Sequence, residues 1–192
     1  MIVRQAGGMP EMVFEYVLKK HNIDPEKDVT LVQNIDFNNT SGAFVGGTGE
    51  YTVEFEPSAT LIEQQGAGYV VASVGTESGY VPYTAYSVTK SYLESHKDIL
   101  TAFTKAIEKG QKYVAEHTAE EVADVIAPQF TDTDKETIQT IVERYAEQDS
   151  FKTNTYFEED SFTLIQDILE EAGELESRVE YDTLVTTEFS TK

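Results

Sequence analysis

The 192-residue sequence contains no cysteine. Disulfide frameworks, cysteine-ligated zinc sites and thiol nucleophiles are therefore excluded. Basic residues are also scarce, since 14 Lys and Arg stand against 35 Asp and Glu, which gives a formal net charge of −21. Nucleic acid and anionic membrane surfaces both require a positive protein face, so we expect neither as a partner.

Long apolar runs and a leader sequence are missing as well. No run of about 18 apolar residues is present, so the sequence predicts no membrane-spanning helix. Met1 to Val3 is followed at once by Arg4, which is not the pattern of a signal peptide. Two interpretations follow: a cytoplasmic chain, or part of a longer protein whose leader lies outside this sequence.

Recognisable catalytic motifs are absent too. The sequence has neither a G-x-S-x-G motif nor a P-loop, and G-G-T-G-E at 46–50 is not a G-x-G-x-x-G that opens a helix. His21, His96 and His117 each lie near the end of a predicted helix and far from one another in sequence, which is typical of cap and surface positions. We therefore predict no catalytic residue, no metal site and no cofactor.

What the sequence does contain is enough apolar residues for a core, at 40% hydrophobic and 11% aromatic. Up to about residue 90, predicted strands alternate with predicted helices, which indicates an α/β unit with a mostly parallel sheet. The strands are expected at 2–5, 29–32, 50–55, 69–74 and 80–88, and the helices at 10–20, 40–45 and 57–65.

After residue 90 the pattern is helical. Apolar spacing predicts amphipathic helices around 99–114, 122–126, 138–145 and 162–169. Thr118 with Glu121 three residues later forms a capping box for the second, the third opens near Thr133 or Asp134, and the fourth ends at Gly173. No later strand offers these helices a sheet, so we expect their apolar faces to need another partner.

Two glycine-rich stretches are candidates for a ligand site. Residues 44–57 read F-V-G-G-T-G-E-Y-T-V-E-F-E-P, which can form one wall of a small-molecule site or a plain tight turn. Gly7 and Gly8 stand directly before a predicted helix, where free N–H groups suit an anion or a polar ligand, although a simple strand-to-helix turn fits equally.

Four tyrosines lie on or beside the predicted strand ends: Tyr51, Tyr80, Tyr83 and Tyr86. Their flat rings and hydroxyl groups suit a planar ligand, and they suit ordinary packing between strands as well.

The order of these motifs resembles the periplasmic-type solute-binding proteins of ABC importers, in the group named for NMT1/THI5-like and SsuA-like proteins. The resemblance rests on G-G-M-P-E at 7–11, the run from 46 to 57, Y-V-V-A-S-V at 69–74, V-P-Y-T-A-Y-S-V at 81–88 and S-Y-L-E-S-H-K-D-I-L-T-A-F at 91–103. It implies two α/β lobes that close around a small molecule.

In that family, further strands and helices of the first lobe precede the segment that starts here. The resemblance therefore implies that residues 1–75 form the second lobe, and that 76–192 are a crossover strand and the mostly helical C-terminal part of an incomplete first lobe. It also implies an extracytoplasmic place for the full-length protein, in the periplasm or anchored by lipid to the cell surface, with the signal and half of the cleft missing from this chain. The orphaned helices are then expected to bury their apolar faces against another copy or to be rearranged.

The resemblance further implies a set of ligand-binding residues: Gly7, Gly8, Met9, Asn34, Thr48, Gly49, Glu50, Tyr51 and Glu56. Backbone N–H groups hold a polar edge of the ligand, Glu50 accepts from an amine or a ring N–H, and Tyr51 stacks. Family ligands include thiamine pyrimidine precursors, sulfonates, nitrate and riboflavin, and the acidic chain favours a neutral or cationic heteroaromatic molecule. The implied partners are an ABC permease and its ATPase.

Two alternatives stay open. Some relatives are pyrimidine-synthesising enzymes that act on a bound cofactor and their own histidine, and other domains of this fold sense ligands. No histidine falls in the predicted cleft loops, and a cysteine-rich motif cannot exist here. A binding protein without catalytic activity is therefore the favoured prediction.

Overall fold

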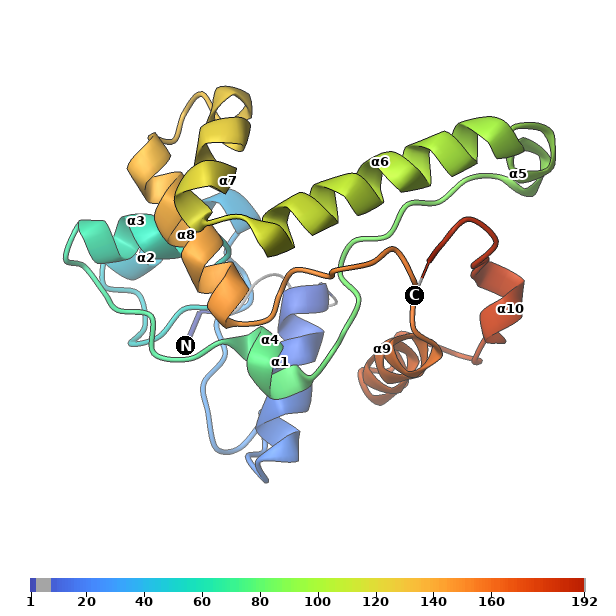
Figure 1. Cartoon of the computed structure of the whole chain (residues 1–192). Coiled ribbons are helices and arrows are strands. Elements are labelled where there is room, and N and C mark those ends of the chain that lie inside the picture. Colours follow the sequence, from blue (N-terminus) through green and yellow to red (C-terminus); the bar gives the residue numbers. More distant parts are fainter. Residues whose placement is uncertain (3–7, 192) are drawn as a thin grey trace.

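The computed structural model describes residues 1–2 and 8–191, and helices dominate it (Figure 1). The helices are α1 (Met9–Lys20), α2 (Thr40–Val45), α3 (Ser58–Gln64), α4 (Val74–Ser78), α5 (Lys90–Ser95), α6 (Lys97–Glu116), α7 (Ala119–Ile126), α8 (Lys135–Glu147), α9 (Glu159–Glu171) and α10 (Tyr181–Leu184), with 3₁₀ turns η1 (Phe37–Asn39) and η2 (Ala127–Gln129).

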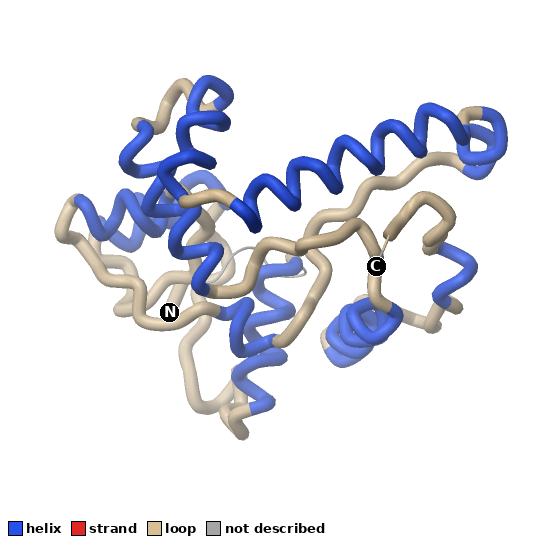
Figure 2. The backbone as a smooth tube through the Cα atoms, in the orientation of Figure 1, coloured by secondary structure: helices blue, strands red, loops and turns tan. Residues whose placement is uncertain are grey.

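The predicted α/β lobe with a mostly parallel sheet is wrong, because none of the described residues belongs to a strand (Figure 2). Ile2 makes isolated parallel bridges to Val32 and to Thr52. Its N–H donates to the carbonyl of Tyr51 at 2.8 Å, and the N–H of Val32 donates to the carbonyl of Met1 at 2.9 Å. The predicted strands at 2–5, 29–32 and 50–55 thus come together at Ile2. Beyond these bridges, the described residues form no continuous β-ladder.

The other two predicted strands, 69–74 and 80–88, do not pair as strands with any described residue, and Val74 begins α4 instead. Their β-branched and aromatic residues favour an extended backbone, but a strand also needs a neighbour for its hydrogen bonds and its cross-strand side-chain contacts. Tyr69 and Val71 are instead 84% and 77% exposed. The sequence pattern identified segments with strand character, whereas the pairing depends on partners that the pattern does not specify.

The predicted helices are confirmed, and the signals at their ends explain why. Glu121 completes the capping box of α7, since its backbone N–H donates to the Thr118 hydroxyl at 3.3 Å and its carboxylate accepts the Thr118 N–H at 2.9 Å. Asp134 caps α8 by accepting the N–H of Thr137 at 2.9 Å. These contacts lie within three residues, so local sequence is sufficient to predict them.

Burial is divided among three small cores. One joins α7 to α8 through Val122, Ala123, Ile138 and Val142. A second surrounds Phe14 and Leu18 with residues of the following loop, and a third joins α1 to α9 through Met12, Val13 and Ile168. Helix α1 therefore takes part in two of the three cores, and its apolar spacing supplies both faces.

The C-terminal end of helix α6 packs against the α7–α8 core through Tyr113 and Val114, and the rest of α6 extends away as a long arm, with the chain that leads into α5 beside it (Figure 1). The rings of Tyr86 and Phe103 meet edge to face across this contact, with centroids 4.9 Å apart. No residue of α6 is buried, and Ile99 and Phe103 remain exposed. Among the described helices, none has both the length and the apolar character that crossing a membrane requires.

Candidate functional site

The start of α1 forms as the glycine and proline residues predict. Gly8 precedes the helix in an extended conformation, and its carbonyl accepts the N–H groups of Glu11 and Met12 at 3.0 and 3.1 Å. Met9 packs against the core between α1 and α9. Gly7 lies outside the described residues. The candidate ligand residues of this stretch therefore begin a helix that is firmly docked.

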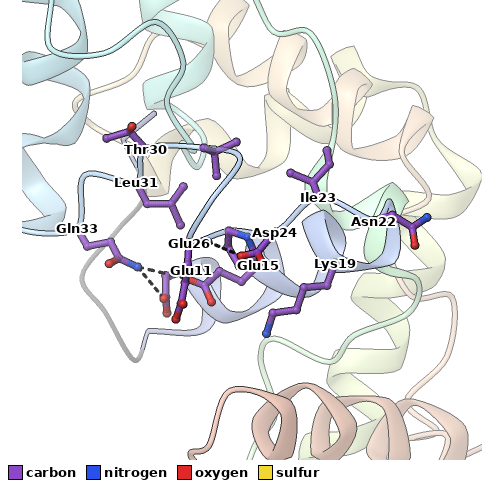
Figure 3. A pocket seen from close by; sticks show the side chains of 12 residues that line it. Glu11, Glu15, Lys19, Asn22, Ile23, Asp24, Glu26, Thr30, Leu31 and Gln33 are labelled. Carbon is purple, nitrogen blue, oxygen red and sulfur yellow. Dashed lines mark hydrogen bonds between the residues drawn. The ribbon is translucent and has the colours of Figure 1, made fainter.

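A hollow of about 1000 Å³ lies between α1 and the loop that follows it (Figure 3). The amide of Gln33 donates to the buried carboxylate of Glu11 at 2.8 Å and is 3.4 Å from that of Glu15. Lys19, on the same wall, pairs with Glu171 of α9 at 3.1 Å. Of the predicted site residues that the structure describes, none lines this hollow.

Within 1–2 and 8–191, no group of three or more His, Asp or Glu side chains has an arrangement that could hold a metal ion.

The glycine turn at 46–50 connects α2 to the segment beside Ile2. Gly49 has φ +78°, a conformation that L side chains rarely adopt, which explains why glycine occupies this position. The N–H of Thr48 donates to the carbonyl of Ala43 at 2.9 Å. The side chains of Glu50 and Tyr51 are exposed. The turn therefore presents an acid and an aromatic ring at the surface.

Glu56 occupies a different environment. Its side chain is 5% exposed, and one carboxylate oxygen pairs with Nη1 of Arg144 on α8 at 2.5 Å. The other oxygen accepts the N–H of Thr60 at 3.0 Å. The same Arg144 also donates to the Thr60 hydroxyl and to Glu63. Glu56 thus ties the glycine-turn segment to α8.

Electrostatics support this network. The N–H of Val70 donates to Glu63 at 2.8 Å and, with the hydrogen bond from Arg144, lowers the pKa of Glu63 against the opposing effect of burial. Burial disfavours the charged form of Arg144, but its hydrogen bonds to Glu56 and Glu63 outweigh burial and raise the Arg144 pKa. Sequence reasoning missed Arg144, because no local signal links it to a carboxylate 88 residues away.

Three aromatic rings gather beside this segment, and we call Phe37, Phe55 and Tyr83 the aromatic cluster. The ring centroids of Phe37 and Phe55 are 6.1 Å apart, and those of Phe55 and Tyr83 are 5.3 Å apart. Tyr83 was among the candidate tyrosines, whereas both phenylalanines were missed. Asn34, a predicted ligand residue, is exposed just before the turn η1 that carries Phe37.

The structure brings only some of the predicted residues together. Gly49 and Tyr51 both lie against Ile2, the first by close approach and the second by a backbone hydrogen bond. Glu56 is engaged with α8 instead. Gly8, Met9 and Asn34 belong to the start of α1 and to the loop after Val32.

Comparison with known proteins gives two findings. The sequence pattern described as the NMT1-like family matches residues 1–127, a range that holds every predicted site residue and the aromatic cluster but not Arg144. The protein named "Putative binding protein YtlA" of Bacillus subtilis (strain 168) is 47% identical over 189 residues, which are 98% of this chain and 57% of that protein. The chain thus spans a little over half the length of this relative.

These matches confirm the resemblance to NMT1/THI5-like proteins, while the assignment to an ABC importer stays a prediction. Since the matched range extends over most of the chain, the chain belongs to the NMT1-like family.

Proposed function

We propose that this chain is the ligand-binding part of an extracytoplasmic solute-binding protein that serves an ABC importer. The observation that carries the proposal is the 47% identity to a protein named as a binding protein, over 98% of this chain. The division into a second lobe at 1–75 and a returning first-lobe part at 76–192 belongs to the same proposal.

In this proposal the ligand contacts the start of α1 and the turn at 48–51. Gly7, Gly8 and Met9 supply backbone groups, Asn34 and Thr48 supply polar side chains, and Gly49 shapes the turn. Glu50 accepts a hydrogen bond from the ligand and Tyr51 stacks on it, which their exposure permits. Glu56 supports the site from behind, because its carboxylate is held by Arg144.

A binding role is favoured over an enzymatic one by the places of the histidines. His21 follows α1 and pairs with Glu77 at 3.1 Å. His96 and His117 flank α6 and stack on Tyr92 and Tyr113, with ring centroids 4.0 and 3.7 Å apart. These positions suit helix ends and leave no histidine beside Glu50 or Tyr51 in the proposed site.

The proposed partners are a small molecule and an ABC permease with its ATPase. We also propose that the uncovered apolar face of α6 associates with a second copy of the chain. Support comes from the exposure of Ile99 and Phe103 towards the start of α6, a helix in which no residue is buried. Light scattering after size exclusion tests this part separately, and a stable monomer at high concentration contradicts it.

Calorimetry tests the ligand site. The 192-residue chain is incubated with a bacterial metabolite extract, and any retained molecule is identified by mass spectrometry and titrated. Glu50→Ala should weaken binding, whereas Glu94→Ala, an exposed change on α5, should not. Equal affinity for both variants rejects the proposed role of Glu50, and failure to retain any small molecule rejects the binding function.

A further inference from the structure

The aromatic cluster is formed by residues that are far apart in the sequence. Phe37 lies in η1, Phe55 in the segment after the glycine turn, and Tyr83 in the extended chain before α5. Phe55 is central, since its ring contacts the rings of both other residues. The cluster therefore depends on the fold bringing three segments to one place.

The cluster is also open to solvent. Phe37 is 55% exposed and Tyr83 is 64% exposed. Full burial of a large apolar side chain stabilises by about 1.5–3 kcal/mol, and these two rings forgo much of that gain in the chain as it stands. The planes of the Phe37 and Tyr83 rings are tilted by 39° and 52° to the Phe55 ring rather than stacked face to face on it. Exposed aromatic surface of this kind is typical of binding sites.

The charge around the cluster indicates what it can bind. All three aromatic residues come from 28–89, a stretch that contains no Lys and no Arg. Of its seven acidic residues, Glu56 and Glu63 are paired with Arg144 and Glu77 is paired with His21, whereas Asp36 directly precedes Phe37 and Glu54 directly precedes Phe55. Glu54, directly before Phe55, accepts a hydrogen bond from the Thr52 hydroxyl at 2.9 Å. Aromatic faces and carboxylates both attract cations, whereas an anion gains from neither.

We propose that Phe37, Phe55 and Tyr83 bind the ring of a planar, cationic heteroaromatic solute. This inference rests on the proposed binding function and makes it more specific, because it disfavours sulfonate and nitrate as ligands. Rings supply stacking and cation–π attraction, and the carboxylates of Asp36 and Glu54, the residues next to Phe37 and Phe55, supply electrostatic attraction.

Arg144 positions this site through Glu56. The carboxylate of Glu56, the residue that follows Phe55, accepts hydrogen bonds from the guanidinium of Arg144 and from the N–H of Thr60. Glu56 lies in a turn, and the carbonyl of Phe55 accepts the N–H of Ala59 at 3.2 Å, so anchoring this turn restrains the backbone that carries the Phe55 ring. The buried ion pair between Arg144 and Glu56 thus stabilises the turn next to Phe55, the central ring of the cluster.

Four probes of known chemistry test the proposal on the 192-residue chain by calorimetry and by NMR of the Phe and Tyr rings. They are 1-methylnicotinamide (planar cation), nicotinamide (planar and neutral), benzenesulfonate (planar anion) and choline (a cation without a ring). We expect 1-methylnicotinamide to bind at least about tenfold more tightly than benzenesulfonate and choline, and to shift the ring signals of the cluster.

Variants locate the site. Phe55→Leu and Tyr83→Leu should each weaken binding of 1-methylnicotinamide about tenfold. Tyr69→Leu is the matched control, because Tyr69 is 84% exposed and lies outside the cluster, and it should bind as the parent chain does. Tighter binding of benzenesulfonate, equal binding of choline, or equal loss in the Tyr69 variant overturns the proposal. Shifts of the cluster signals that depend only on protein concentration also overturn it, since they indicate contact with a second copy.

A final arm separates this inference from the proposed function. The parent chain and the Phe55→Leu and Tyr83→Leu variants are exposed to the same metabolite extract and examined by mass spectrometry. Retention of a planar cation by the parent alone supports the inference. Equal retention by the variants overturns the inference while the binding function stands, and retention by none of the chains rejects both.

Discussion

The guanidinium of Arg144 binds the carboxylate of Glu56 across 88 residues of sequence. Their side chains are 19% and 5% exposed, so the pair is largely removed from solvent. It connects α8, which lies beyond the range that matches the family, to the segment that carries Phe55. Arg144 therefore couples the helical part of the chain to the proposed ligand site.

Replacing Arg144 tests this coupling. Arg144→Met removes the partner of a buried carboxylate, and we expect a loss of about 3 kcal/mol in the free energy of unfolding. Arg178→Met is the control, because Arg178 pairs with Asp167 and Glu170 at an exposed site. Exposed pairs contribute about 1 kcal/mol or less. Urea denaturation followed by circular dichroism measures both, and equal losses contradict the structural role of Arg144.

The contact between α1 and α9 gives a second prediction. Ile168 is 1% exposed and packs against Met12 and Val13. Ile168→Ala leaves a cavity there, and we expect a loss of about 2–5 kcal/mol. Ile99→Ala on α6 removes the same atoms from a half-exposed position, so its effect should be much smaller. If the two variants unfold at the same urea concentration, α9 does not pack on α1 as described.

Acid should loosen the hairpin of α7 and α8. Hydrogen bonds from the N–H of Thr118 and from the N–H of Thr137 lower the pKa of Glu121 and of Asp134, respectively. Because each folded-state pKa lies below its unfolded value, their stabilisation is present above about pH 4 and is lost as the pH falls through the lowered values.

The measurement is an acid titration of helicity by circular dichroism, with residue-level signals from NMR. Asp134→Asn keeps an accepting oxygen at the cap but does not titrate, so it should reduce the pH dependence of α8. Asp132→Asn, two residues before the cap, should leave that dependence as it is. The opposite ranking of the two variants is incompatible with capping by Asp134.

The features that sequence predicted correctly are local. Thr118 with Glu121, and Asp134 with Thr137, act over three residues, and apolar spacing marked α1, α6 and α9 within single segments. The sheet failed because pairing joins distant segments, and the described residues retain only the bridges at Ile2. The aromatic cluster was missed for the same reason. The residue type of Tyr83 made it a candidate, but its contact with Phe55 joins distant segments and could not be predicted from local sequence.

Two glycine-to-alanine substitutions test whether α6 faces solvent around Gly110, with Gly68 as the closely packed contrast. A Cβ at Gly110, within α6, meets no other atom within 4 Å, so Gly110→Ala should stabilise the chain by about 0.5–1 kcal/mol through helix propensity. A Cβ at Gly68 would lie 2.8 Å from the ring of Phe44 and 3.0 Å from Ile62, so Gly68→Ala should destabilise. Thermal unfolding at low and high protein concentration distinguishes the causes. A stabilising Gly110→Ala at both concentrations indicates that this part of α6 faces solvent, whereas stabilisation only at low concentration places a second copy against it.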